Sequence, residues 1–297
     1  MKNTNQQWST LPYAGEQKPP SNPEEPGAGS WATHFIQLQD DYLFTKKNGD
    51  PIHFQIKDPQ LIDFTKELGI VENTLNQLTD TQIDQAKFWG TGPPTKQIIP
   101  ILDKLIDTYQ VPAPRAARIL AAVLAAINDT FVVTWFLKFK YDVARPNQVN
   151  PSFETLLCTP RHPSYPSGHA TIAGCTEVVL SYFFPGEAKR LKEISKECAD
   201  SRLYAGVHYP IDNIEGLRLG RQMGRIVVAE LKKEYETKNK TIDKPYTRNL
   251  KAITAPPPYE QVIPYPYKNN CDSLLLENNK EQPSHAQPLS KPRLYIK

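Results

Sequence analysis

Cysteine is scarce in this sequence and scattered along it. The four residues, Cys158, Cys175, Cys198 and Cys271, form no CxxC pair, and their spacing does not suit a structural zinc site. The opening residues, MKNTNQQ, also lack the basic and apolar stretches of a secretory signal. We therefore expect free, partly buried thiols and a cytoplasmic protein.

An excess of charge of one sign is also missing. The 35 Lys and Arg residues nearly balance the 32 Asp and Glu residues, which leaves a net charge of +3. Such a chain has no strong overall field to attract nucleic acid or an anionic membrane. We expect no nucleic-acid partner, and any preference for anions must come from a local arrangement. A homo-oligomer stays open.

Long hydrophobic runs are absent with one exception, residues 116–137. This run contains Arg118, Asn128 and Asp129, and a charged side chain at the centre of a bilayer costs about 2 to 3 kcal/mol. We therefore expect the core helix of a soluble protein and no integral membrane span. Asp129 should have a partner inside the fold, and a basic residue near the functional site is one candidate.

The chain divides by composition into three parts. Residues 1–30 are rich in proline and predict an extended arm that buries little apolar surface. Residues 246–297 predict a proline- and tyrosine-rich tail, either floppy or wrapped around the domain. Between them, residues 31–245 predict a single all-α helical bundle domain.

The helices of this domain are predicted from apolar residues that recur at three- and four-residue spacings. No run alternates convincingly as a strand would. Ala117, Ala121 and Ala125 form a ladder of small side chains that should let a neighbouring helix approach closely. The expected helices cover residues 58–69, 79–89, 95–109, 114–143, 168–184, 187–201 and 211–236.

Two cations mark the end of the longest predicted helix. Lys138 and Arg145 are seven residues apart, so they lie on one helix face about 10 Å apart along the axis. Pro146 biases Arg145 away from helical geometry and ends the helix there. Alone, such a pair is typical of a solvated surface.

The segment Pro-Ser-Gly-His at 166–169 adds an anion site. Ser167 is a natural N-cap, and a helix that begins there offers unpaired backbone N–H groups and the positive end of its dipole. Gly168 allows an anion to come close to that backbone. His169, in the first turn, is placed to give or take a proton at a bound oxygen.

The third piece is the stretch SRLYAGVHYPID. Asp212 lies four residues after His208 and can accept its ring N–H, which fixes the tautomer and leaves the other ring nitrogen free to attack or ligate. Arg202 offers a bidentate clamp for two oxygens. Together, Lys138, Arg145 and Arg202 bring three positive charges that match a phosphate or vanadate group.

These three segments resemble the signature of the superfamily that joins type 2 phosphatidic acid phosphatases, bacterial class A acid phosphatases and vanadium-dependent haloperoxidases. The signature reads Lys-x6-Arg-Pro, Pro-Ser-Gly-His and Ser-Arg-x5-His-x3-Asp, and all three parts stand intact between residues 138 and 212. The wider context, with FWGTGPP at 88–94 and WFLKFKYDVARP at 135–146, resembles the soluble bacterial haloperoxidase-type members. The resemblance implies a helical bundle.

The resemblance also implies residue roles. His208 attacks phosphorus or coordinates vanadate, His169 is the acid/base residue and Asp212 orients His208. Trp135 and His162 resemble positions that line the halide side of the vanadate pocket. The residues that hold the equatorial oxygens would be Lys138, Arg145, Ser167, Gly168 and Arg202.

Three hypotheses follow for the function. The first is vanadate-dependent oxidation of halide by hydrogen peroxide, with vanadate as cofactor and His208 as its ligand. The second is metal-independent hydrolysis of phosphate monoesters, from acid or lipid phosphates, through a phospho-His208 intermediate and with no cofactor. The third is a non-catalytic structural protein that retains the pocket. The first two predict small anionic partners: halide and peroxide, or a phosphate ester.

Overall fold

The computed structural model describes residues 6–40, 43–152, 154–236 and 240–263. It is 56% helical and 5% strand, so the predicted all-α class is confirmed. The strands β1 (Ile36–Leu38) and β2 (Phe44–Lys46) form one small antiparallel pair that the sequence did not predict. The α-helices are α1 (Phe64–Leu75), α2 (Asp80–Gly90), α3 (Thr95–Thr108), α4 (Ala113–Tyr141), α5 (Pro146–Val149), α6 (Gly168–Phe183), α7 (Ala188–Tyr204) and α8 (Pro210–Leu231).

Each of the seven predicted helices exists, but the first begins later than predicted. Pro59 opens a short 3-10 turn, η4 (Pro59–Leu61), and Asp63 then caps α1 by accepting a hydrogen bond from the backbone N–H of Lys66. The cap fixes the first residue of α1 at Phe64 because it satisfies an otherwise unpaired N–H. The one-turn helix α5 is too short to show a periodicity and was not predicted.

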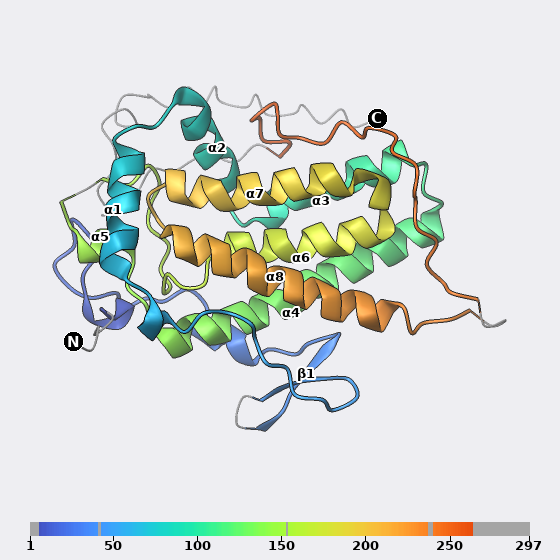
Figure 1. Ribbon diagram of the computed structural model, residues 1–297, viewed down its shortest axis with the longest axis horizontal. Helices are drawn as coiled ribbons and strands as arrows, with labels where there is room; N and C mark the ends of the chain where they lie inside the picture. The colour runs from blue at the N-terminus through green and yellow to red at the C-terminus, as the bar shows by residue number, and fades with distance from the viewer. Residues whose placement is uncertain (1–5, 41–42, 153, 237–239, 264–297) are drawn as a thin grey trace, which may run out of the picture.

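The long helices pack around α6. Figure 1 shows α4, α6, α7 and α8 running side by side, with α1 standing across the end of the bundle near α5. Helix α6 contacts α8, α7 and α4, and its residues are buried along nearly its whole length. Since α6 begins at Gly168, the predicted anion site lies at the end of the most central helix.

Glycines on α8 bring it very close to α6. Gly216, Gly220 and Gly224 follow at four-residue spacing, and a Cβ atom at Gly220 would lie 1.9 Å from the carbonyl oxygen of Thr171. A Cβ atom at Gly216 would lie 2.8 Å from the carbonyl oxygen of Ser167. Glycine is therefore required where these two backbones meet.

The alanine ladder predicted on α4 is wrong. Ala117 and Ala121 are exposed and Ala125 is half-buried, so the ladder meets no neighbouring helix closely. The buried face of α4 carries Ala122 and Ala126 instead. The four-residue spacing of alanines could not identify the buried face of α4, because a helix this rich in alanine has small residues on several faces.

The N-terminal segment packs on the bundle, and the prediction that it buries little apolar surface is wrong. Trp8 and Tyr13 are 4% and 1% exposed. The indole N–H of Trp8 donates to the Tyr13 hydroxyl at 2.5 Å, and that hydroxyl donates to the carbonyl of Pro160 at 2.8 Å. Further along, a Cβ atom at Gly29 would lie 2.7 Å from the backbone N of Phe136 in α4. Two buried aromatic residues and one close glycine contact therefore hold this proline-rich segment on the bundle.

The C-terminal segment also packs on the helices as far as the structure describes it. Tyr246 stacks on Phe184 with ring centroids 5.4 Å apart, and Tyr259 donates its hydroxyl to Glu197 of α7 at 3.3 Å. The rest of the predicted tail, with the YPY motif at 265–267, lies outside the described residues. The domain boundaries at residues 30 and 245 stay predictions.

Asp129 has a partner, but not the basic residue that was a candidate. Its carboxylate accepts from the backbone N–H groups of His34 at 2.8 Å and Phe35 at 2.6 Å. The buried carboxylate therefore joins the N-terminal segment to α4. This explains a charged side chain in an apolar helix without any role at the site.

Helix α4 is long and apolar enough to cross a membrane by length and composition alone. In the structure, 61% of its most apolar window is buried inside the protein. This is the burial expected of a core helix.

The prediction of free thiols holds for two of the four cysteines. Cys175 and Cys198 are free and buried. Cys158 is disulfide-bonded, so the prediction is wrong there, and Cys271 lies outside the described residues. Spacing in the sequence carries no information on which thiols a fold brings together.

Candidate active site

The eight predicted site residues come from three stretches of the chain, which lie at the ends of five helices. Lys138 lies near the end of α4, and Arg145 stands just before α5 in an extended conformation with φ −75° and ψ 155°, as the following proline dictates. Ser167 caps α6, and Gly168 and His169 form its first turn. Arg202 lies in the last turn of α7, while His208 precedes α8 and Asp212 lies in its first turn.

Arg145 is the centre of the hydrogen-bond network. Its guanidinium is fully buried, with Nε donating to the carbonyl of His162 at 3.0 Å and Nη1 donating to the carbonyl of Val207 at 2.7 Å. Nη1 also lies 2.9 Å from Nε2 of His208, and Nη2 lies 3.0 Å from Nδ1 of His162. One planar cation thus holds the loop around His162 and the third segment of the signature together.

His208 is oriented from behind by a carboxylate, as predicted. Its Nδ1 lies 2.9 Å from Oδ2 of Asp212, and that oxygen also accepts from the backbone N–H of Tyr209 at 3.1 Å. Both side chains are at most 2% exposed. With Nδ1–H donating to Asp212, the lone pair of Nε2 points to the side of Arg145.

Ser164 is a site residue that the sequence reasoning missed. Its hydroxyl donates to Oδ2 of Asp212 at 2.5 Å and lies 3.5 Å from Nδ1 of His208. It stands three residues before Ser167, inside the segment that was singled out for its Pro-Ser-Gly-His end. Nothing in the spacing distinguishes it from an ordinary loop serine.

Lys138 reaches the loop before α6. Its Nζ donates to the carbonyls of Pro163 and Ser164 at 2.7 and 2.9 Å, and it is fully buried. Gly168 lies beside it, since a Cβ atom there would be 3.9 Å from Cε of Lys138 and 3.6 Å from the ring of Trp135. A side chain at position 168 would therefore occupy the space next to Lys138.

Ser167 begins α6 in the way predicted. Its hydroxyl accepts from the N–H of Ala170 at 3.4 Å, and its own N–H donates to the carbonyl of Asp212 at 3.0 Å. The start of α6 is therefore tied to the start of α8. The first-turn N–H groups and the positive end of the α6 dipole lie beside the buried cations.

His169 is held by Trp89. A hydrogen bond to the backbone of Trp89 occupies one ring nitrogen, while Nε2 is buried with no hydrogen-bond partner among the residues the structure describes. A buried ring nitrogen without a partner is uncommon in proteins, and a bound polar group or water molecule would satisfy it. Trp89 belongs to the FWGTGPP segment, which the sequence reasoning noted without giving this tryptophan a role.

Arg202 passes close to the end of α2. A Cβ atom at Gly90 would lie 2.7 Å from Nη1 of Arg202 and 2.1 Å from the side chain of Leu157. Gly90 thus leaves room for the guanidinium, which is 2% exposed. The charge of Arg202 acts on both His169 and His208.

Trp135 and His162 form one wall of the site. Their ring centroids are 4.8 Å apart, and they are 9% and 7% exposed. The indole N–H of Trp135 donates to the backbone carbonyl of Glu24 at 3.1 Å. The two residues predicted to line the halide side are therefore neighbours, and the N-terminal segment lies against them.

Burial and the surrounding cations set the protonation of the site. Burial, together with Arg145, Lys138 and Arg202, lowers the pKa of His208 well below its ordinary value. Burial raises the pKa of Asp212 to about 6, against hydrogen bonding from Ser164 and the nearby cations. At pH 7 this pair therefore consists of a neutral imidazole and a carboxylate.

The same two causes act on the other ionisable groups. Burial lowers the pKa of Lys138 well below its ordinary value, and the charge of Arg145 adds to the effect. Burial also lowers the pKa values of His162 and His169, with the nearby cations contributing in the same direction. A bound oxyanion would relieve this mutual repulsion, so the arrangement favours an anion.

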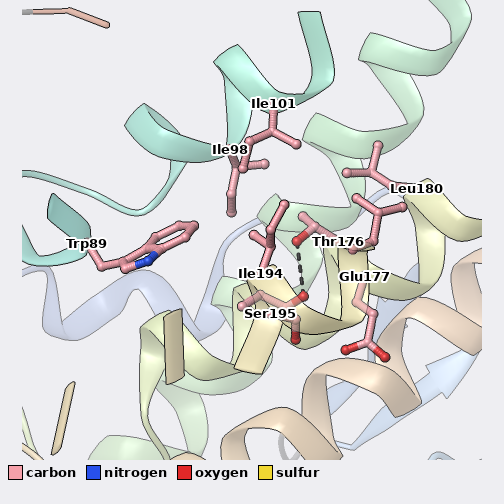
Figure 2. A pocket seen from close by; sticks show the side chains of 10 residues that line it. Trp89, Ile98, Ile101, Thr176, Glu177, Leu180, Ile194 and Ser195 are labelled. Atoms are coloured by element: carbon pink, nitrogen blue, oxygen red, sulfur yellow. Dashed lines mark hydrogen bonds between the residues drawn. The ribbon is translucent and has the colours of Figure 1, made fainter. Parts of the chain in front are cut away.

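A small cavity beside Trp89 is separate from this site. Figure 2 shows its lining side chains, which come from α2, α3, α6 and α7 and are mainly apolar. Its volume of about 20 Å³ has room for a single water molecule. It is too small for a phosphate ester or a vanadate ion.

Comparison with known families and structures bears on the fold. The PAP2 superfamily model matches residues 116–235, which contain all eight predicted site residues. No curated protein matches the chain.

Solved structures with a similar fold include a bacterial vanadium-dependent iodoperoxidase, at 22% identity and a TM-score of 0.60 over 77% of this chain and 62% of that one. A bacterial vanadium-dependent chloroperoxidase in its holo form matches at 15% identity and a TM-score of 0.53, over 76% of this chain and 61% of that one. A transmembrane PAP2-type phosphatidylglycerolphosphate phosphatase from Bacillus subtilis matches at 19% identity and a TM-score of 0.45, over 59% of this chain and 88% of that one.

This chain thus spans less than two thirds of the length of either peroxidase. At these identities the likeness establishes the fold. The PAP2 superfamily model matches the part of the chain that carries the candidate site, and the fold resembles that of the two bacterial vanadium-dependent peroxidases.

Proposed function

We propose that the protein is an enzyme that oxidises halide with hydrogen peroxide, using vanadate held by His208. The observation that carries the proposal is the wall formed by Trp135 and His162 beside an oxyanion pocket. A rigid, mostly apolar surface next to the cations suits a weakly hydrated halide ion. The likeness in fold to two proteins described as vanadium-dependent peroxidases supports the same choice.

The residues present fit a tetrahedral oxyanion. Two observations support this fit: Nε2 of His169 is buried without a hydrogen-bond partner among the described residues, and a Cβ atom at Gly168 would have room beside Lys138. Lys138, Arg145 and Arg202 would hold the oxygens, with Ser167 and the backbone of Gly168, and His208 would be the ligand through Nε2. When bound, vanadate would supply the Lewis acidity that activates peroxide.

The remaining steps belong to the chain's own groups. Asp212 holds the Nδ1 proton of His208, which keeps Nε2 deprotonated and aimed at the pocket. His169 accepts or returns a proton at a bound oxygen, because its lowered pKa leaves the imidazole neutral and Nε2 free to accept a proton. Arg145 and Arg202 neutralise charge on the oxygens from a buried position, where a hydrogen bond to a charged group is strong.

The test is an assay of the purified protein stripped of oxyanions. Oxidation of chloride, bromide and iodide by hydrogen peroxide and hydrolysis of p-nitrophenyl phosphate are measured side by side, each with and without micromolar orthovanadate. We expect halide oxidation that appears only when vanadate is added. Hydrolysis that vanadate inhibits, without halide oxidation under any condition, would overturn the proposal.

Phosphate monoester hydrolysis is the second candidate, and the position of His169 favours it. A buried, neutral ring nitrogen near cations can take up a proton once substrate binding has raised its pKa, and can then pass this proton to the leaving oxygen. In that reaction the Nε2 of His208 attacks phosphorus as the ester oxygen leaves with the proton from His169, and water then hydrolyses the phospho-His208. No cofactor takes part, so trapping of 32P on His208 distinguishes this candidate.

A further inference from the structure

The N-terminal segment places Glu24 against Trp135, one of the two residues that form the wall of the site. Glu24 is fixed by its backbone on both sides: its N–H donates to the carbonyl of Arg161 at 2.8 Å, and its carbonyl accepts from the indole of Trp135 at 3.1 Å. Both partners flank His162, whose ring contacts Trp135 and Arg145. The position of Glu24 is therefore set by the same wall that lines the site.

The rest of the segment is anchored too. Arg161 forms an ion pair with Glu16 at 2.8 Å and lies over the ring of Tyr13 at 5.1 Å. On the other side of Glu24, the 3-10 turn η2 (Pro26–Ser30) packs on α4 through Gly29. The backbone of Glu24 is thus anchored on both sides, which keeps this residue close to the wall of the site.

The charge of Glu24 reaches the pocket. Burial lowers the pKa of both Lys138 and Arg145, and the Glu24 carboxylate opposes this effect at both residues. The Glu24 side chain is exposed. Its negative charge therefore repels an anion that approaches the buried cations from this side of the protein.

From this placement we infer that Glu24 is a specificity-determining residue that selects against doubly charged oxyanions at the proposed oxyanion site. The inference rests on the proposed oxyanion pocket and extends it to the charge of the substrate. Repulsion between Glu24 and an incoming anion doubles when the anion carries two charges instead of one. Singly charged anions, such as halides or the monoanionic forms of phosphate and vanadate, are thereby favoured.

The test uses two tetrahedral oxyanions that differ by one charge. Tungstate is a dianion and perrhenate a monoanion, so their dissociation constants are compared by titration calorimetry, with perrhenate measured in competition if it binds weakly. Glu24→Gln should tighten tungstate binding about three- to tenfold at low salt and perrhenate binding by a smaller factor. The difference should shrink at 0.5 M salt, since an exposed charge is screened.

Glu25→Gln is the matched control, because Glu25 is the next residue, is also exposed and carries the same charge. It should leave both dissociation constants unchanged. Equal effects of Glu24→Gln on the two oxyanions, or none on either, would overturn the inference while the pocket itself stands. If the unmodified protein binds neither oxyanion, the proposed function and the inference fail together.

Discussion

The Nη1 atom of Arg145 lies 2.9 Å from the Nε2 atom of His208, the atom that would attack or ligate. The guanidinium therefore covers the lone pair that the reaction uses. An oxyanion that binds at His208 must take over this hydrogen bond, after which Arg145 donates to the oxyanion. Arg145 thus keeps the imidazole in place before binding and holds the anion afterwards.

Replacing this arginine should weaken oxyanion binding even when the positive charge is kept. Arg145→Lys keeps the charge but loses the planar group that contacts His162, Val207 and His208 together, so we expect tungstate to bind at least tenfold more weakly. Calorimetry measures the change. Arg218→Lys, at a position 53% exposed on α8, is the control and should bind tungstate normally. Equal affinity of the Arg145 variant would contradict the role given to the fork geometry.

Asp212→Asn should lower turnover while the pocket still binds oxyanions. An amide in place of the carboxylate no longer requires Nδ1–H of His208, so the wrong tautomer becomes available and kcat should fall about 10- to 100-fold or more. Asp103→Asn, at an exposed position of α3, serves as control. Full activity of the Asp212 variant would contradict the orienting role given to Asp212.

Ser164→Ala tests the residue that the sequence did not reveal. Loss of the 2.5 Å hydrogen bond to Asp212 removes a contact that lowers the carboxyl pKa, so this pKa should rise further. The acid limb of the pH–rate profile should then move to higher pH, with a modest loss of kcat at pH 7. Ser164→Thr, which retains a hydroxyl, should restore the profile. A fall in kcat with an unchanged profile would indicate a merely structural role.

The buried histidines should make the oxyanion-free protein sensitive to acid. His162 and His208 have folded-state pKa values below their unfolded values, so the unfolded state binds more protons at mildly acidic pH. Stability is then fully present above the unfolded pKa and is lost as pH falls below it. Asp212, with a raised pKa of about 6, contributes in the opposite direction and offsets part of the loss.

We expect the Tm at pH 5.5 to lie about 5 °C or more below the Tm at pH 7.5, measured by calorimetry at one salt concentration. His53→Gln, at an exposed position, should leave the difference unchanged. An equal or higher Tm at pH 5.5 would mean that these imidazoles are charged in the folded protein.

Gly220→Ala should destabilise the fold. Its Cβ atom would lie 1.9 Å from the carbonyl of Thr171, so α6 and α8 must separate, at a cost of about 1 to 3 kcal/mol. Gly69→Ala is the control, because no atom lies within 4 Å of a Cβ atom at this position in α1. That variant should be neutral or slightly more stable. Thermal unfolding of both variants measures the contrast, and equal Tm values would contradict the close approach of the helices.

The sequence predicted well what depends on local pattern. Helix periods gave the bundle, Pro146 set the backbone of Arg145, and the distance of four residues between His208 and Asp212 gave their hydrogen bond. Each of these relationships lies within a few residues along the chain, where spacing translates directly into geometry. The roles of the site residues in a reaction stay proposals.

What the sequence could not give depends on contacts between distant segments. The hydrogen-bond donors to Asp129 lie about 95 residues away in the chain. They are backbone N–H groups, whose position cannot be predicted from residue type. Trp8 and Glu24 stand in proline-rich surroundings whose composition predicts an arm, yet the fold places them against the bundle. Ser164 lies just before the Pro-Ser-Gly-His segment and differs from other loop serines only in its contacts with Asp212 and His208.

The hydrogen bond from the N–H of Ser167 to the carbonyl of Asp212 has a bearing on how the molecule opens. It joins the first turns of α6 and α8 just where the glycine contacts between these helices begin. Local unfolding starts where backbones are least packed, so the far ends of the two helices should fray first. Amide hydrogens around the oxyanion pocket would then exchange with solvent only when the whole bundle unfolds. The reactive centre would therefore be the last part of the protein to unfold.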